Sequence, residues 1–279
     1  MIDLIISTLE MGSIYSLLVL AVHVTSNIIG IDDFSIEGSF ATGSALGLIL
    51  TNMHVPTGIT IACILLSGMF VGLITTILHT IIGIESLLAG IIVTTGLFSC
   101  NLKMAGAQGS LEKTIFDVHT LTAQNHWLIL VPLALSMTAL IRWLLTTETG
   151  LFLHAVGNNP HFITLLGKNP KKYIALGPVI ANSLASLAGF LFVHHTGFFS
   201  ITGSIGVLIS ALAGLIIGAS ICGSWIGGSW LGAVLYQAII TTVIYQQLDP
   251  VWNKLITASI IVVHVMIKHM KKQNMRRLS

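Results

Sequence analysis

Two long stretches without a charged residue dominate the pattern of polar and apolar positions along the chain. No Asp, Glu, Lys or Arg occurs from Gly38 to Ile84, or from Tyr173 to Leu248. At about 1.5 Å of rise per residue the second stretch would form roughly 114 Å of helix, whereas one crossing of the hydrocarbon core needs about 30 Å. It therefore predicts about three membrane crossings separated by short polar turns.

Glycine, proline and polar residues divide the whole chain into about nine candidate membrane segments. The second segment is short for a full crossing and follows a cluster of acidic residues, so a broken or half-membrane helix is expected there. The predicted fold is an all-α, polytopic transmembrane helical bundle of about eight or nine segments, with a broken second helix, forming one domain over residues 1–279. The candidate segments are 4–29, 38–53, 56–79, 84–102, 127–146, 173–195, 203–221, 226–246 and 251–268.

The composition agrees with lipid surroundings. Only 8% of the residues are charged and 54% are hydrophobic, whereas a soluble domain carries about 25% charged residues. The chain therefore lacks the charge that would cover a water-exposed surface. Its net charge of +2 offers no basic face for nucleic acid. The abundance of apolar residues excludes a disordered chain.

The few basic residues predict the orientation of the bundle. They gather in a loop, about residues 147–172 with Arg142 just before it, and in a tail over residues 268–279. Cytoplasmic segments of membrane proteins are enriched in Lys and Arg, so both should be cytoplasmic. Four candidate segments separate them, which is consistent because the number is even. The polar segment of about residues 103–126 is then external, and the side of the N-terminus stays open.

Three acidic residues lie between the first and second candidate segments. Ionisable groups at membrane depth are costly and tend to line polar cavities, so one interpretation is a translocation pathway that would meet a cationic group of the solute. The other is an interfacial loop in which Asp33 or Ser35 caps the next helix. The two interpretations can coexist. The candidate pathway consists of Asp32, Asp33, Glu37, Gly38 and Gly43.

Small residues recur every four positions in several candidate segments. In lipid, such stripes let helix backbones approach closely. They predict a tightly packed bundle, or a dimer interface, without indicating what the bundle does. The stripes are Ser39, Gly43 and Gly47; Gly68 and Gly72; Gly214 and Gly218; and Gly228 and Gly232.

The cytoplasmic loop contains signals for a short helix. Asn159 is the expected N-cap, Pro160 the first helical residue and Gly167 the C-terminal stop. The helix predicted from Pro160 to Leu166 is largely apolar, and so short a helix is not stable alone in water. It must dock, either on its own bundle or on a partner.

Sequence signatures of catalysis and metal binding are missing. Gly167-Lys168 is followed by Asn169, so no phosphate-binding G-x-x-x-x-G-K-[ST] loop is present, and no G-x-S-x-G motif occurs. The histidines, including the adjacent His194 and His195, fit no metal-binding spacing, and the three cysteines are isolated. The chain is expected to bind no metal or cofactor and not to be an enzyme.

Four segments together resemble the permease subunit of bacterial ATP-binding cassette importers of the branched-chain amino acid and ribose permease type. The most specific is HAVGNNPHFITLLGKN, which is similar to that family's cytoplasmic coupling segment. The nearest resemblance is to the uncharacterised and tryptophan- or tyrosine-type permeases. Ser220 departs from the pattern, because relatives tend to carry an acidic residue there. The segments are Met11–Leu46, Ser86–Gly106, His154–Asn169 and Gly206–Val263.

The resemblance implies a partner assembly in a bacterial plasma membrane. Two permease subunits, expected as a homodimer, would form the pore. Two cytoplasmic ATPases would carry ATP and magnesium, and an extracytoplasmic solute-binding protein would deliver an amino acid, with aromatic amino acids among the candidates. An ion-coupled secondary transporter is the alternative, because acidic residues at a broken helix would suit it. The residues implied in ATPase coupling are Gly157, Asn158, Asn159, Pro160, Phe162, Leu165, Leu166 and Gly167.

Overall fold

The first long helix changes its winding before it ends. In the computed structural model, which describes residues 2–111, 126–223, 226–246, 252–263 and 266, helix α1 (Ile2–Val22) continues into a π-helix, η1 (His23–Ile29). Gly30 ends it in the left-handed conformation, with φ of 75°. A backbone hydrogen bond of 2.9 Å from Ile31 N–H to the Thr25 carbonyl closes the last turn. The second helix was predicted to be broken, but it is continuous, and the interruption lies before it, at residues 30–34.

The other elements confirm the all-α architecture. The helices that follow are α2 (Ser35–Asn52), α3 (Thr57–Thr80), α4 (Ser86–Ala105), α5 (Trp127–Thr146), α6 (Glu148–Asn158), α7 (Pro160–Leu165), α8 (Pro170–Thr196), η2 (Thr202–Ser204), α9 (Val207–Cys222) and α10 (Gly227–Tyr245). Residues 252–263 are also helical. Within the described residues, seven helical stretches are long and apolar enough to cross a membrane, and the chain is a multi-pass membrane protein.

Two of the candidate segments differ from full crossings. Helix α2 is one uninterrupted helix of 18 residues and is rich in Ser, Thr and Gly. Because it is enclosed by α3, α4 and α8, it needs little apolar surface toward lipid. The last segment, predicted over 251–268, is represented by a short apolar helix, Trp252–Val263, and its remainder and the basic tail lie mostly outside the described residues.

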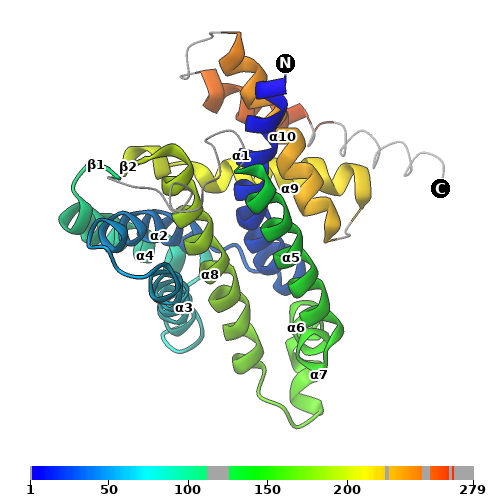
Figure 1. The fold of residues 1–279 in the computed structure, drawn as a ribbon. Helices are drawn as coiled ribbons and strands as arrows, with labels where there is room; N and C mark the ends of the chain where they lie inside the picture. Colours follow the sequence, from blue (N-terminus) through cyan, green and yellow to red (C-terminus); the bar gives the residue numbers. More distant parts are fainter. Residues whose placement is uncertain (1, 112–125, 224–225, 247–251, 264–265, 267–279) are drawn as a thin grey trace, which may run out of the picture.

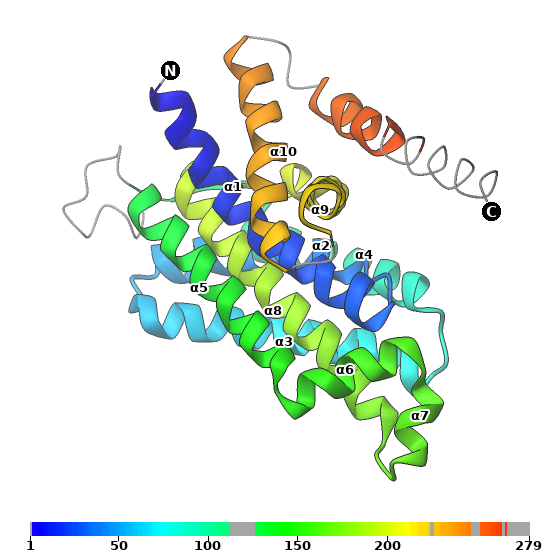
Figure 2. The same cartoon turned by 90° about the vertical axis from the view of Figure 1, so that its right-hand side faces the viewer.

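Helices α1 and α8 form the centre of the bundle (Figures 1 and 2). Helix α8 packs against α1, α2 and α3, and most of the residues in its apolar stretch are buried. Helices α3, α4 and α5 instead expose large apolar side chains, among them Phe70, Phe98 and Trp143. That is the surface expected of helices that face lipid rather than water.

The stripes of small residues serve contacts inside the chain. A Cβ at Gly68 or Gly72 would collide with the backbone of α8, at Asn182 and Pro178 respectively. The stripes of α9 and α10 face one another, with Gly218 against the backbone of Gly228. The prediction of close helix packing is confirmed.

A small two-stranded sheet was not predicted. Strand β1 (Gln108–Ser110) pairs antiparallel with β2 (Phe198–Ser200), with Gly109 opposite Phe199. Each strand follows the end of a long helix, α4 or α8, after a glycine with positive φ, Gly106 or Gly197. Much of the predicted external segment, residues 112–125, lies outside the described residues.

Candidate functional site

Helices α6 and α7 form a compact pair at one end of the bundle, at the bottom of Figures 1 and 2. The side chain of Asn159 accepts a hydrogen bond of 3.0 Å from His161 N–H, so Asn159 caps α7 as predicted. At the other end Gly167 has φ of 72°, and hydrogen bonds from Gly167 N–H to Thr164 and from Lys168 N–H to Ile163 close the helix. These two bonds form the Schellman arrangement that glycine favours. Helix α6 was not predicted.

One face of α7 anchors it and the other is exposed. Ile163 is fully buried, and the helix packs against α6 and α8. Leu165 is 86% exposed, and Phe162 and Leu166 are each half exposed. Docking on the chain's own bundle therefore leaves three large apolar side chains uncovered. Phe162, Leu165 and Leu166 therefore form an exposed apolar cluster at this end of the bundle.

Helix α6 connects this surface to the end of η1. Gly157 packs so closely that an added Cβ would collide with the carbonyl oxygen of Ile28. Leu153 and Val156, on neighbouring turns, are buried, and α6 also packs against α5 and α8. The predicted coupling residues therefore do not share one surface. Gly157 belongs to an internal contact, whereas Phe162, Leu165 and Leu166 form the outward surface.

A cavity of about 190 Å³ is lined by residues of the same π-helix and of the segment that follows it. Asp32 is exposed, and one of its carboxylate oxygens accepts a hydrogen bond of 2.8 Å from the hydroxyl of Ser26. Leu208 and Leu212 of α9 are among the apolar residues that line the cavity. A cavity that combines a carboxylate and hydroxyl groups with apolar side chains suits a small solute that carries both an ammonium group and an apolar part. The lining residues are Val22, Thr25, Ser26, Asp32, Asp33, Phe34, Ile36, Leu208 and Leu212.

Asp33 also borders the cavity, but its carboxylate is buried in a network of hydrogen bonds. One oxygen accepts from Ser35 N–H at 2.8 Å, at the first residue of α2, while the N-cap position itself is Phe34 and has no side-chain cap. The other accepts from the side-chain amide of Asn182 at 2.9 Å. The carbonyl oxygen of that amide accepts from the hydroxyl of Ser39 at 2.6 Å. Asp33 therefore ties the start of α2 to the middle of α8.

Asn182 is a site residue that the sequence analysis missed. It lies within the long stretch without charges, on the central helix α8, and is fully buried. A lone amide in an apolar segment was the available signal, because a buried polar side chain in lipid must find a partner. The partner, Asp33, could not be identified from the sequence since it lies far away in the chain.

The other predicted pathway residues are separated from this cavity. Glu37 and Gly38 line a second, much smaller cavity of about 40 Å³ between α2, α4 and the segment that precedes α9. The Glu37 carboxylate interacts with backbone N–H groups of Gly206 and Leu208 at the start of α9, where the helix dipole favours a negative charge. Gly43 packs against the backbone of Ser186 and lines neither cavity.

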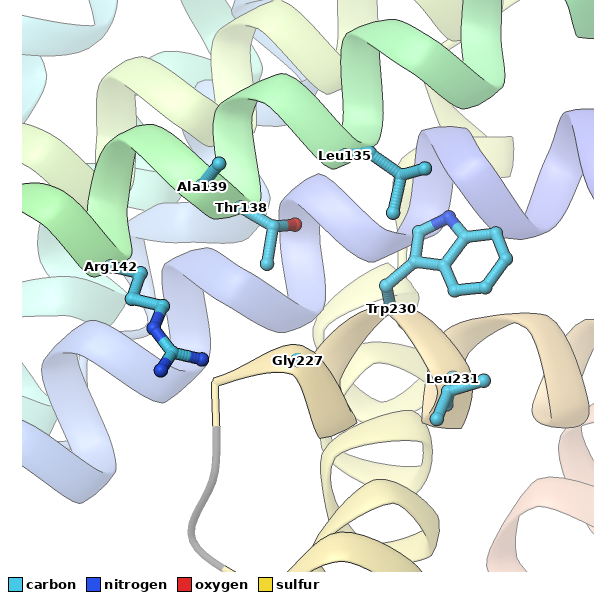
Figure 3. A pocket seen from close by; sticks show the side chains of 7 residues that line it. All are labelled: Leu135, Thr138, Ala139, Arg142, Gly227, Trp230 and Leu231. Carbon is cyan, nitrogen blue, oxygen red and sulfur yellow. The ribbon is translucent and has the colours of Figure 1, made fainter.

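A third cavity, of about 340 Å³, lies between α5 and α10 (Figure 3). Figure 3 shows Leu135 and Thr138 of α5 facing Trp230 of α10, with Arg142 at one end. Its lining is otherwise apolar, and both helices expose apolar side chains. A groove of this kind suits an apolar chain better than a polar solute. The Asp32 cavity is therefore the better candidate for a solute pathway.

The sequence is similar to known transport permeases. The family described as "Branched-chain amino acid transport system / permease component" matches residues 4–266. A "Tyrosine transport system permease protein" of Clostridioides difficile (strain R20291) is 33% identical over 222 residues, which cover 78% of this chain and 73% of that protein. An uncharacterised protein of Rickettsia prowazekii (strain Madrid E) is 28% identical over 222 residues, or 78% of each chain. No solved structure matches the chain significantly.

Proposed function

Because the chain belongs to the family of permease components of branched-chain amino acid transport systems, we propose that it is the membrane-spanning subunit of an ATP-binding cassette importer. A permease component acts together with other subunits of its transport system. In this proposal a separate ATPase supplies the energy, and the exposed face of α7 is where that ATPase binds. The chain itself moves the solute and catalyses no reaction.

The contact between Gly157 and Ile28 carries the proposal. It joins the outward apolar surface of α7, through α6, to the π-helix that leads into the Asp32 cavity. A displacement of α7 by a partner would be passed to η1, because backbone packed against backbone leaves no free space to absorb it. The cavity would then change shape with the state of the ATPase.

The proposed assembly contains two copies of this chain, two cytoplasmic ATP-binding subunits and an extracytoplasmic solute-binding protein. ATP and magnesium would be held by the ATPase subunits. The assembly would lie in the bacterial plasma membrane, with the loop that contains α6 and α7 and the C-terminal tail in the cytoplasm. The enrichment of Lys in residues 168–172 supports that orientation.

The proposed substrate is an amino acid. The carboxylate of Asp32 would attract its ammonium group, and the apolar wall formed by Leu208 and Leu212 would accommodate its side chain. The similarity to a tyrosine transport system permease supports testing aromatic amino acids first.

Reconstitution tests the proposal. The chain is co-expressed with candidate ATPase and binding-protein subunits, purified, and placed in liposomes, and uptake of radiolabelled tyrosine is measured with and without enclosed ATP. ATP-dependent uptake that also requires the binding protein is expected. Uptake driven only by a sodium or proton gradient in ATP-free liposomes would instead show a secondary transporter, and no retained ATPase under any condition would count against the proposal.

A further inference from the structure

Three potential metal ligands from separate parts of the chain meet at the end of the bundle opposite to α7. Glu10 comes from α1, His126 immediately precedes α5, and His195 lies at the end of α8. One ligand atom from each residue lies within 4.8 Å of those of the other two. The two imidazole rings are edge to face, with their centroids 6.2 Å apart.

The cluster is shielded and one of its atoms is unsatisfied. The side chain of Glu10 is 7% exposed and that of His195 is 14% exposed. Nδ1 of His195 is buried without a hydrogen-bond partner among the described residues, and it lies 3.8 Å from Oε2 of Glu10. That distance is too long for a hydrogen bond, and a buried polar atom left unpaired is costly. A cation between the two atoms would satisfy both.

The other oxygen of Glu10 is already fixed. Oε1 accepts a hydrogen bond of 3.0 Å from the backbone N–H of Trp127, the first residue of α5. This bond turns Oε2 toward His195. A hydrogen bond that orients a carboxylate in this way is the usual outer support of a metal ligand.

We propose that Glu10, His126 and His195 form a binding site for a divalent transition-metal cation, with zinc the best match. Two imidazole nitrogens and one carboxylate oxygen are a ligand set that zinc accepts, and the fourth position would hold water. At metal–ligand distances of about 2.0–2.2 Å the ligand atoms would be roughly 3.4 Å apart. A contraction of about an ångström or less per ligand, within the reach of side-chain rotation, would therefore close the site.

The location suggests what the metal would do. Helix α1 packs against both α5 and α8, and the three ligands come from or next to these three helices. A metal held there would fix the ends of α1, α5 and α8 to one another, far from the surface of α7. Because the site exists only when the three helices are assembled, zinc would stabilise the folded protein. The proposal does not depend on the transport function.

Metal binding to the full-length chain provides the test. The protein is purified in detergent with an affinity tag that contains no histidine, and metal is removed with a chelator. Zinc chloride is then added, and binding is followed by calorimetry, by metal analysis after gel filtration, and by the midpoint of thermal unfolding. We expect one tightly retained zinc ion per chain and a rise in the unfolding midpoint.

Substitutions distinguish zinc binding at this site from zinc binding by other histidines of the chain. Glu10→Gln has the same shape and keeps an oxygen for Trp127, and both it and His195→Asn should lose the retained zinc and the rise in midpoint. His54→Asn is the matched control, because His54 is exposed, belongs to no such cluster, and has φ of 58°, which asparagine tolerates.

If the wild-type chain retains no more zinc than the Glu10→Gln variant, the proposal is wrong. A midpoint of thermal unfolding that changes with pH but not with added zinc would likewise overturn the proposal. The cluster would then bind a proton and not a metal ion. Should His195→Asn fail to give a monodisperse protein, the comparison of wild type with Glu10→Gln still decides between these outcomes.

Discussion

Gly157 in α6 packs directly against the carbonyl oxygen of Ile28 in η1, with no room for a Cβ between them. Two segments that lie far apart in the sequence are thereby held backbone to backbone. One of them continues into the exposed helix α7, and the other leads to Asp32 and its cavity. This contact connects the proposed ATPase surface with the proposed solute pathway.

Enlarging Gly157 should therefore uncouple the two sites. In Gly157→Val the added side chain would push α6 away from η1, and overpacking of this kind costs about 1–3 kcal/mol. We expect transport in liposomes to fall by about tenfold or more, as a displacement near an ångström in a positioned site commonly does, while the ATPase still co-purifies. Gly96→Ala is the control, because its Cβ would meet no atom within 4 Å. Equal transport by both variants would contradict the coupling role of this contact.

Changing the exposed face of α7 should affect assembly and not folding. Leu165→Glu alters a side chain that is 86% exposed, so the free energy of unfolding should change by no more than about 0.5 kcal/mol. Binding of the ATPase, measured by co-purification, should be lost because a charge would replace an apolar side chain within the proposed contact surface.

The buried neighbour on the same helix gives the opposite result. Ile163→Ala removes a fully buried side chain, and such truncations cost about 2–5 kcal/mol. Unfolding in detergent should therefore be shifted for Ile163→Ala and unchanged for Leu165→Glu. An unimpaired complex with Leu165→Glu would exclude this face as the ATPase contact.

Asp32 should matter for the substrate and not for stability. Its carboxylate is exposed and, among the described residues, accepts one hydrogen bond, from Ser26 of η1, so Asp32→Asn should unfold at nearly the wild-type temperature. Uptake of amino acids should fall because the amide cannot pair with an ammonium group. Transport assays with ATP and binding protein in excess measure this effect. Wild-type uptake by Asp32→Asn would remove the residue from the proposed pathway.

Asn182 should matter for stability first. In Asn182→Leu the buried carboxylate of Asp33 loses its amide donor, and a buried group left unpaired costs about 1–3 kcal/mol. The neighbouring Ser183→Ala is a suitable control, because that hydroxyl bonds only the carbonyl of Val179 in its own helix. Thermal unfolding in detergent should show a lowered midpoint for Asn182→Leu alone; equal midpoints would mean that the network is dispensable.

Local signals were sufficient for several elements. Asn159, Pro160 and Gly167 begin and end α7 through short-range hydrogen bonds and backbone preferences, so the helix was predicted to within one residue. The long apolar segments could also be predicted from the sequence, because each helix in a membrane must satisfy its own backbone hydrogen bonds over a fixed length. Helix α2 begins three residues earlier than predicted, at Ser35, since polar residues are acceptable in a helix that is enclosed by protein.

Contacts between residues far apart in the chain could not be predicted from local sequence signals. The sequence marked Asp32, Asp33 and Glu37 as one group, but the structure gives them three surroundings: a cavity, a buried network with Asn182, and the start of α9. Gly43 was expected in the pathway and lies in a contact between α2 and α8. Asp32 and Asp33 lie in the connection before α2 and Glu37 lies in its first turn, so the neighbours of each depend on which helices pack beside it.

By itself, then, the sequence determined that this protein is a bundle of membrane helices with a short, largely apolar helix that begins at Pro160, because lipid and capping act on neighbouring residues. Tertiary structure alone decided that Gly157 contacts Ile28, that Asn182 meets Asp33, and that Glu10 and His195 converge. Each of these pairs joins segments far apart in the chain. Their proximity depends on how whole helices pack, and no local spacing of residues encodes that packing.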